Sequence, residues 1–206
     1  MSNMFCKTGD IYSLYTTFGM KKNTIILITG GSCSGKSAFA SSFHHALHLS
    51  TDTFYVHKKN LVMESDGTYN FDDPKNVDLH ECAAAVESLS RGEETIVPVY
   101  DMLTNDRNGT ETIKPKADTK FIVVEGIFAF HSPLRELADI KIFIDTPAEI
   151  RVARRMIRDI ERKGKSKVEI LNDFIAAEKG YAKFIEPMKE FADLVIPHSF
   201  NPFMMD

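Results

Sequence analysis

Long hydrophobic runs and an excess of positive charge are both missing from this sequence, and each absence excludes a class of protein. No apolar run reaches the ~20 residues that a membrane-spanning helix needs. The N-terminus lacks the charged start and continuous apolar core of a signal peptide. A formal net charge of −4 argues against nucleic-acid or membrane-surface binding, because such binding needs a net basic face. We therefore expect no nucleic-acid partner and no membrane partner.

Cysteines are also few. Cys6, Cys33 and Cys82 are odd in number and unpatterned, which predicts a reduced, cytoplasmic setting. A chain of 206 residues can bury a sizeable core as one domain, and no internal repeat or low-complexity tract divides it. The start of the chain shows no periodicity linked to the core. We therefore expect residues 1–19 to be an extension ahead of a domain over 20–206.

The most informative segment is a glycine-rich run at residues 30–37, called the phosphate loop below. It follows an apolar strand-like segment and precedes a helical pattern, the context that a G-x-x-x-x-G-K-[ST] motif requires. Its glycines allow backbone N–H groups to converge on phosphate oxygens. Lys36 is expected to reach the β- and γ-phosphates, and the Ser37 hydroxyl to ligate Mg²⁺. The candidate ATP-binding residues of the loop are Gly30, Gly31, Ser32, Cys33, Ser34, Gly35, Lys36 and Ser37.

The rest of the chain alternates predicted strands and helices, which indicates a doubly wound α/β fold with a mostly parallel sheet of five strands. The predicted strands cover residues 24–29, 47–50, 95–99, 120–125, 140–145 and 194–196. The predicted helices cover residues 35–47, 74–90, 132–137, 147–163 and 167–191. Continuous apolar runs such as 121–124 suit strands that are buried on both faces. The turn residues at 105–109 predict a small β-hairpin.

Capping signals mark where several of these helices begin and end. Asp73-Pro74 and Ser132-Pro133 each place a capping side chain before a proline. Residues 146–149 form a capping box that begins at Thr146. Pro187 is expected to interrupt the last helix.

Carboxylates follow two of the predicted strands. Asp52 comes after the strand at 47–50, and Glu125 ends the strand at 120–125. Ligands of such folds sit at the carboxyl ends of the strands. Glu125 is therefore suited to hold a metal ion or its water shell. Asp52 is suited to orient an attacking hydroxyl and take its proton late, although helix capping or simple solvation would also explain it.

The predicted helix over 147–163 carries five arginines. At helical spacing, Arg151, Arg154 or Arg155, Arg158 and Arg162 share a face. A solvated basic face is the ordinary explanation for such a run. Because the stripe accompanies a phosphate loop, a lid over about 147–170 is the better explanation. Such a lid would close on ATP and exclude water, since guanidinium groups match phosphate oxygens.

Several motifs in order resemble the uridine–cytidine kinases, within the P-loop kinases that include phosphoribulokinase and pantothenate kinase. The resemblance spans residues 24–197. It rests on GGSCSGKS at 30–37, TDTFY at 51–55, YNFDDP at 69–74, IVPVYD at 96–101, VVEGIFAF at 123–130, KIFIDTPAEIRVARRMIRDI at 141–160 and FADLVIP at 191–197. This resemblance implies an ATP-dependent kinase that phosphorylates the 5′-hydroxyl of a ribonucleoside, with uridine or cytidine as the expected substrate. It also suggests a homo-oligomer.

The resemblance assigns roles at the phosphates. Lys36 and the loop backbone bind ATP, and Ser37, Glu125 and Asp52 form the Mg²⁺ site. The lid arginines Arg154, Arg155 and Arg158 bind the phosphates. The residues expected to act in catalysis are Asp52, Lys36, Arg154 and Arg158.

It assigns a second set of roles at the nucleoside. Asp52 faces the 5′-hydroxyl, and Asp72 binds the ribose hydroxyls together with Arg151. Tyr55 and Tyr100 line the nucleoside pocket. A carboxylate recognises a diol through two accepted hydrogen bonds, so such a pocket rejects deoxy analogues.

Two departures from the family pattern concern the base. Asn105 stands where the family has a histidine, and Glu169 stands near the position of a glutamine. Asn offers a donor and an acceptor, whereas an ionised Glu only accepts, which would favour an amino-bearing base such as cytosine.

Two other functions are compatible with the phosphate loop. The alternatives are a kinase for another hydroxyl substrate, such as nicotinamide riboside or a non-nucleoside, and a non-catalytic nucleotide-binding regulator. The sequence has no N-K-x-D run for guanine, which argues against a regulatory GTPase. The presence of all four residues expected at the phosphates argues against a non-catalytic nucleotide-binding regulator. These residues are Lys36, Ser37, Asp52 and Glu125.

Overall fold

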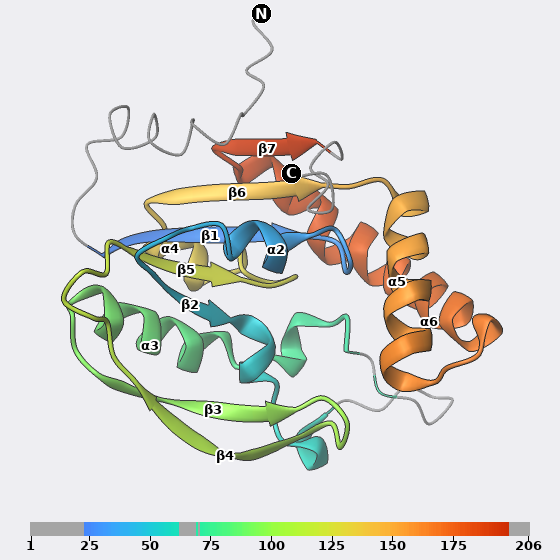
Figure 1. Ribbon diagram of the computed structural model, residues 1–206, viewed down its shortest axis with the longest axis horizontal. Coiled ribbons are helices and arrows are strands. Elements are labelled where there is room, and N and C mark those ends of the chain that lie inside the picture. The colour runs from blue at the N-terminus through green and yellow to red at the C-terminus, as the bar shows by residue number, and fades with distance from the viewer. Residues whose placement is uncertain (1–22, 62–68, 70, 198–206) are drawn as a thin grey trace, which may run out of the picture.

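The structure, a computed structural model, describes residues 23–61, 69 and 71–197. The expected extension at 1–19 lies outside these residues. The described part has a central sheet of five parallel strands in the order β2-β5-β1-β6-β7. These strands are β1 (Thr24–Gly30), β2 (Ala46–Ser50), β5 (Phe121–Glu125), β6 (Ile140–Asp145) and β7 (Leu194–Pro197). Helices flank the sheet (Figure 1), which confirms the predicted doubly wound α/β fold.

The sheet is buried on both faces. Every residue of β1 is buried, and its side chains alternate between two cores. Ile25 and Leu27 pack into the larger core with α3 (Leu79–Ser90), whereas Ile26 and Ile28 pack into the smaller core with α2 (Lys36–Ala40). This two-sided burial explains the continuous apolar runs of the central strands.

The helices differ from the prediction mainly in length. The predicted helix over 35–47 is wrong beyond its first turns, because α2 ends at Ala40 and strand β2 begins at Ala46. The predicted helix over 74–90 begins as a 3-10 turn, Pro74–Asn76, and α3 starts later. Pro187 does interrupt the last predicted helix, which divides into α6 (Lys167–Gly180), a π turn (Tyr181–Ile185) and a 3-10 segment (Glu186–Phe191). The remaining helices are α4 (Leu134–Leu137) and α5 (Ala148–Lys163).

The three predicted caps differ from the expectation in different ways. Asp73 caps only the 3-10 turn, and Asp78 caps α3 by accepting from the backbone N–H of Glu81. The Ser132–Pro133 bond is cis, and no side chain caps α4. Thr146 donates its hydroxyl to the carbonyl of Ser34 at 2.8 Å instead of capping α5. The predicted capping box is therefore wrong, and its threonine ties the start of α5 to the phosphate loop.

A two-stranded antiparallel hairpin, β3 (Thr95–Asp101) and β4 (Asp106–Ile113), stands apart from the main sheet. In Figure 1, α3 lies between the hairpin and the sheet. The turn falls at residues 102–105, with Asn105 at a φ of 55°, and Gly109 lies inside β4. The hairpin was predicted correctly, but its turn lies a few residues earlier than the glycine suggested.

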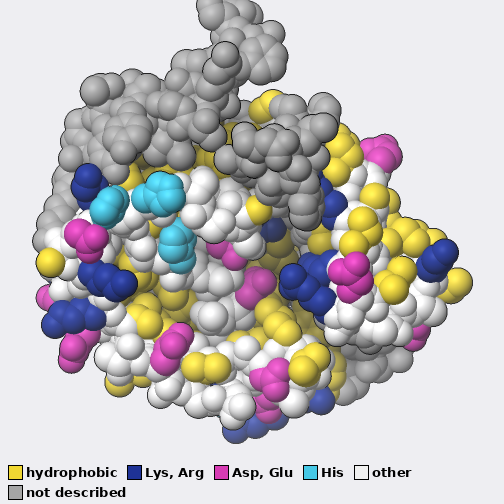
Figure 2. Space-filling model, viewed as in Figure 1, with side chains coloured by type: hydrophobic (Ala, Val, Ile, Leu, Met, Phe, Trp, Pro, Cys, Tyr) yellow, Lys and Arg dark blue, Asp and Glu magenta, His cyan; other side chains and the backbone are white. Residues whose placement is uncertain are grey.

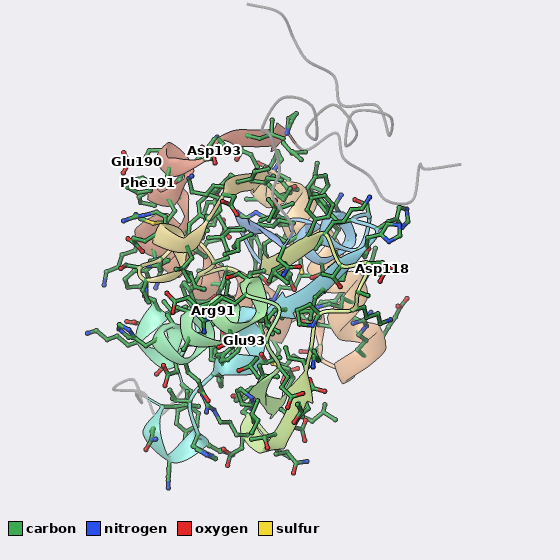
Figure 3. All side chains as sticks on the ribbon, turned by 90° about the vertical axis from the view of Figure 1, so that its left-hand side faces the viewer. Arg91, Glu93, Asp118, Glu190, Phe191 and Asp193 are labelled. Atoms are coloured by element: carbon green, nitrogen blue, oxygen red, sulfur yellow. The ribbon has the colours of Figure 1, made fainter. Side chains whose placement is uncertain are left out.

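Polar side chains at the edge where the parallel strands begin serve the fold itself. Figure 3 faces this edge, with Arg91 and Glu93 close together beyond α3 and Asp193 just before β7. Arg91 and Glu93 form an ion pair at 2.9 Å. Asp193 accepts from the backbone N–H of Lys141 at 2.8 Å, which joins β6 to the chain entering β7. The opposite edge, where the strands end, is the one that carries the predicted site. Among the described residues, no helix has the length and apolar character to span a membrane.

A close backbone contact fixes the two carboxylate-bearing strand ends relative to each other. A Cβ at Gly126 would lie 1.8 Å from Oγ1 and 2.9 Å from Cβ of Thr51, whose side chain is fully buried. We expect Gly126→Ala to lower the free energy of unfolding by about 3 kcal/mol or more, because the short, fully buried side chain of Thr51 cannot move away from the new methyl group. Chemical denaturation measures this change.

Gly109→Ala is the matched control, because Gly109 also has a positive φ but has nothing within 4 Å of its would-be Cβ. Its cost should be limited to about 1–2 kcal/mol of backbone strain. Equal losses in the two variants would contradict the importance of the Thr51 contact.

Candidate active site

The phosphate loop connects β1 to α2 and closes tightly on itself. The backbone N–H of Ser34 donates to the carbonyl of Gly31 at 3.1 Å, and Cys33 adopts a left-handed φ of 62°. The Lys36 ammonium donates to the same Gly31 carbonyl at 2.9 Å and lies buried under the loop. The Ser34 hydroxyl is buried and makes no hydrogen bond within the described structure. The loop therefore presents a glycine-lined cradle with an unused polar group, which fits a phosphate ligand.

Lys36 lies in a cluster of charges. Burial lowers the pKa of Lys36, whereas the carboxylates of Glu125 and Asp52 raise it. These carboxylates come from β5 and from the 3-10 turn after β2, Thr51–Phe54. The register of the parallel sheet brings them together, because Glu125 pairs with Ile28 of β1 and with Ser50 of β2. The predicted meeting of Lys36, Asp52 and Glu125 at the carboxyl edge is thus present.

Asp52 has an electrostatic environment suited to proton transfer. Its pKa is raised to about 6, first by burial and then by the charge of Glu125, while Lys36 and Arg158 lower it. Its backbone N–H donates to the Ser50 hydroxyl at 3.2 Å, which fixes the start of the turn. A carboxylate with a pKa near neutrality is a stronger base than an ordinary aspartate and still ionises at physiological pH.

Ser37 and Glu125 form a small oxygen-rich corner beside Lys36. The Ser37 hydroxyl donates to Oε1 of Glu125 at 3.2 Å. The described residues contain no cluster of three or more His, Cys, Asp or Glu side chains that could hold a metal ion. Mg²⁺ in phosphate-transfer sites uses one or two carboxylates and completes its shell with phosphates and water. A hydroxyl and a carboxylate next to a phosphate cradle fit that requirement.

Two arginines of α5, Arg151 and Arg154, lie against the phosphate loop, whereas Arg162 is exposed. Arg154 donates to the Ser34 carbonyl at 3.0 Å. Asp159, almost fully buried, pairs with Arg155 at 3.5 Å and with Arg158 at 2.7 Å. Figure 2 shows basic side chains on the α5 side of a hollow and acidic side chains across from them. The stripe is therefore no ordinary solvated face.

The aromatic residues predicted for the nucleoside, Tyr55 and Tyr100, lie against each other, and the charge of Asp52 acts on both. The Tyr55 hydroxyl donates to the Phe71 carbonyl at 2.8 Å, and the rings of Tyr55 and Tyr100 lie 5.3 Å apart. Burial raises the pKa of Tyr55, and Asp52 and Asp72 raise it further. Burial also raises the pKa of Asp72, against the lowering effect of Arg155. The Tyr100 hydroxyl is buried without a hydrogen-bond partner in the described structure.

Glu169 and Arg151 have surroundings that differ from the expectation, whereas Asn105 lies where it was predicted. Glu169 accepts from the backbone N–H of Ser166 at 2.8 Å, completing a capping box at the exposed start of α6. Arg151 is buried and pairs with Glu178. Asn105 lies in the hairpin turn. Their predicted roles at base and ribose stay predictions.

The structure also reveals residues that the sequence analysis missed. Asp159 organises two arginines, and its position four residues after Arg155 was a usable signal. Arg107 links the hairpin to the pocket by donating to the Tyr55 carbonyl at 2.8 Å and pairing with Glu81. Glu178 pairs with Arg151 across 27 residues. The contacts of Arg107 and Glu178 join segments far apart in the chain, so no local sequence pattern indicates them.

The fold and the site define a P-loop kinase. The chain matches the model of the phosphoribulokinase / uridine kinase family over residues 25–201 and belongs to that family. It is an ATP-dependent kinase of that family.

Curated relatives extend over almost the whole chain. It is 35% identical over 187 residues to a uridine kinase of Clostridium perfringens, covering 86% of this chain and 88% of that one. It is 36% identical over 187 residues to a uridine kinase of Macrococcus caseolyticus, covering 86% and 89%.

Solved structures share the fold at low identity. A candidate fructose transport system kinase from a Silicibacter species has a TM-score of 0.72 at 18% identity and covers 94% of this chain and 100% of its own. A possible uridine kinase from Bacillus stearothermophilus has a TM-score of 0.63 at 18% identity, covering 92% and 96%. Phosphoribulokinase from Rhodobacter spheroides has a TM-score of 0.59 at 19% identity, covering 89% and 74%.

The raised pKa of Asp52 has a consequence for stability. In the folded protein the pKa of Asp52 is about 6, whereas an unperturbed aspartate has a pKa of 3.8. The free energy of unfolding therefore falls as pH rises through this interval. Above it, the wild type is destabilised by the whole free energy of ionising buried Asp52. We expect Asp52→Asn to stabilise the protein by about 3 kcal/mol at pH 8, with the gain vanishing below about pH 4. Urea denaturation at the two pH values measures the gain.

Asp118→Asn is the control, because Asp118 is exposed and the hydrogen bond from His45 lowers its pKa. It should show no gain at either pH. An Asp52→Asn variant that is less stable than wild type at pH 8 would show that the ionised carboxylate of Asp52 does not destabilise the folded protein.

Proposed function

We propose that this kinase transfers the γ-phosphate of ATP to the 5′-hydroxyl of a ribonucleoside, uridine or cytidine, forming the nucleoside monophosphate and ADP. One observation carries the proposal. Asp52 is coupled electrostatically to Lys36 and Glu125 on the phosphate side and to Asp72 and Tyr55 on the pocket side. A base at that junction is placed to act on an acceptor alcohol beside a triphosphate.

The residues on the phosphate side bind and neutralise the triphosphate. The loop backbone and Lys36 hold it, and Lys36 gains a phosphate partner in place of its bond to Gly31. In a loose transition state, charge spreads over the transferring oxygens, so positioned cations matter more than covalent chemistry. We propose that Arg154 and Arg158 supply these cations, with Arg155 beside them, as α5 and the start of α6 act as a lid over about 147–170.

Magnesium is part of the proposal. Ser37 and Glu125 would hold it, with Asp52 nearby, and when bound it would neutralise charge on the phosphate oxygens.

The residues on the pocket side orient the acceptor. Asp72 accepts hydrogen bonds from the ribose hydroxyls, and the tilted pair of Tyr55 and Tyr100 forms an aromatic wall. Asp52 orients the 5′-hydroxyl and takes its proton late in the transfer. Asn105, at the hairpin turn, is the candidate reader of the base. Glu169 is left out of the proposed pocket, because it is exposed and caps its own helix.

The relatives support the acceptor class, since the two curated proteins described above are uridine kinases that match most of this chain. A cytoplasmic location and a homo-oligomeric state remain part of the proposal.

The substrate is tested by ADP release with uridine, cytidine, their 2′-deoxy forms, nicotinamide riboside and fructose. We expect turnover with uridine or cytidine, and a loss of about a hundredfold or more with the 2′-deoxy forms, because Asp72 would then lose a hydrogen-bond partner. Asp52→Asn should lose about 10²–10⁴-fold in turnover while its affinity for ATP stays within about threefold. The proposal fails if no ribonucleoside is turned over or if Asp52→Asn remains active.

The pH dependence tests the role of Asp52 separately. With Mg²⁺ and ATP saturating, we expect kcat/KM for the nucleoside to fall about tenfold per pH unit below a midpoint near 6, as Asp52 becomes protonated. Asp118→Asn should leave the profile unchanged. A profile that is flat between pH 5 and pH 7 would exclude Asp52 as the group that takes the proton.

A further inference from the structure

Arg151 is the most enclosed cation of α5, with only 3% of its surface exposed. Its Nε donates to the Thr146 carbonyl at 2.9 Å, and its Nη1 and Nη2 donate to the two oxygens of Glu178 at 2.5 and 2.7 Å. The guanidinium also lies over the ring of Tyr181, 4.3 Å from its centroid. A guanidinium has five N–H donors, so these bonds leave two N–H groups for a ligand.

The held guanidinium touches the phosphate loop. A Cβ at Gly31 would lie 2.6 Å from Nη1 and 2.8 Å from Cζ of Arg151, so only glycine fits there. Burial lowers the pKa of Lys36, and the positive charge of Arg151 adds to that lowering. An unpaired Arg151 would therefore oppose the loop lysine. The carboxylate of Glu178 compensates that charge.

The helix that carries Glu178 is also fitted against the pocket side. A Cβ at Gly180 would lie 2.5 Å from Cβ and 2.9 Å from the carbonyl oxygen of Asp72, so the end of α6 packs on the backbone of Asp72. Burial raises the pKa of Asp72, and Glu178 raises it further. Glu178 thus lies near both Arg151 and the proposed ribose-binding carboxylate.

We propose that Glu178 is a positioning residue for the acceptor. It fixes the plane of the Arg151 guanidinium between the phosphate loop and Asp72, so that the two remaining N–H groups are directed at the acceptor sugar. The inference rests on the proposed function, because the acceptor is taken to be bound by Asp72. It adds a residue from α6, outside the loop, the strand ends and the α5 stripe. Glu178 acts through Arg151 and does not itself touch the reacting atoms.

Glu178→Gln tests the proposal, because it keeps the shape of the side chain but loses the charge and one accepted bond. We expect KM for the nucleoside to rise tenfold or more, while KM for ATP stays within twofold and kcat within threefold. Glu178→Asp should have a nucleoside KM between those of Glu178→Gln and wild type. Thermal unfolding of each variant confirms that the enzyme is folded at the assay temperature.

Asp173→Asn is the matched control. Asp173 lies on the same helix and also raises the pKa of Asp72, but it pairs with Lys165 and has no bond to Arg151. It should leave KM for the nucleoside within twofold of wild type. On an Arg151→Lys background, Glu178→Gln should add less than twofold, since its effect passes through the guanidinium.

The outcomes separate this inference from the proposed function. Equal rises in both KM values, a change in kcat alone, or the same effect from Asp173→Asn overturns the role of Glu178 while leaving the acceptor assignment intact. A wild-type enzyme that uses a different alcohol overturns the acceptor assignment, and the same KM comparison with that alcohol still decides the role of Glu178. An enzyme that phosphorylates no acceptor overturns both.

Discussion

The buried ammonium group of Lys36 is held beside the carboxylates of Asp52 and Glu125. These two carboxylates oppose the lowering of the Lys36 pKa by burial, and Lys36 in turn limits the rise in the pKa of Asp52. Desolvation makes each isolated charge expensive, so the groups are tolerable only together. This mutual compensation leaves Asp52 with a pKa near neutrality. Lys36 donates to the carbonyl of Gly31, and in the proposed function a phosphate oxygen replaces that carbonyl as its acceptor.

The parallel sheet makes this compensation possible by bringing three strand ends to one edge. Glu125 is in register with Ile28 and Ser50, and Gly126 lets the β5 end close onto Thr51. The phosphate loop continues from β1, and Thr146 at the end of β6 bonds back to the loop. The site therefore depends on the strand termini, while the proposed lid comes from α5 and the start of α6.

Three arginines of the basic stripe of α5 are paired with acidic side chains. Asp159 is almost fully buried between Arg155 and Arg158, and Glu178 compensates Arg151. These acidic partners fix the positions of the guanidinium groups. Preorganised cations of this kind need little rearrangement when charge develops on the transferring group.

The sequence by itself determined the strand order along the chain, the phosphate loop and the identities of Lys36, Ser37, Asp52 and Glu125. Those features depend on local signals: apolar runs, glycine spacing and the residues that directly follow a strand. It failed for the extent of α2 and for the caps at Ser132 and Thr146, where tertiary contacts outweigh local preference. The pairing of Arg151 with Glu178, the packing of Gly180 on Asp72 and the raised pKa of Asp52 were decided only by the tertiary structure. Each depends on burial or on the distance between segments far apart in the chain, and neither quantity is defined until the sheet has assembled.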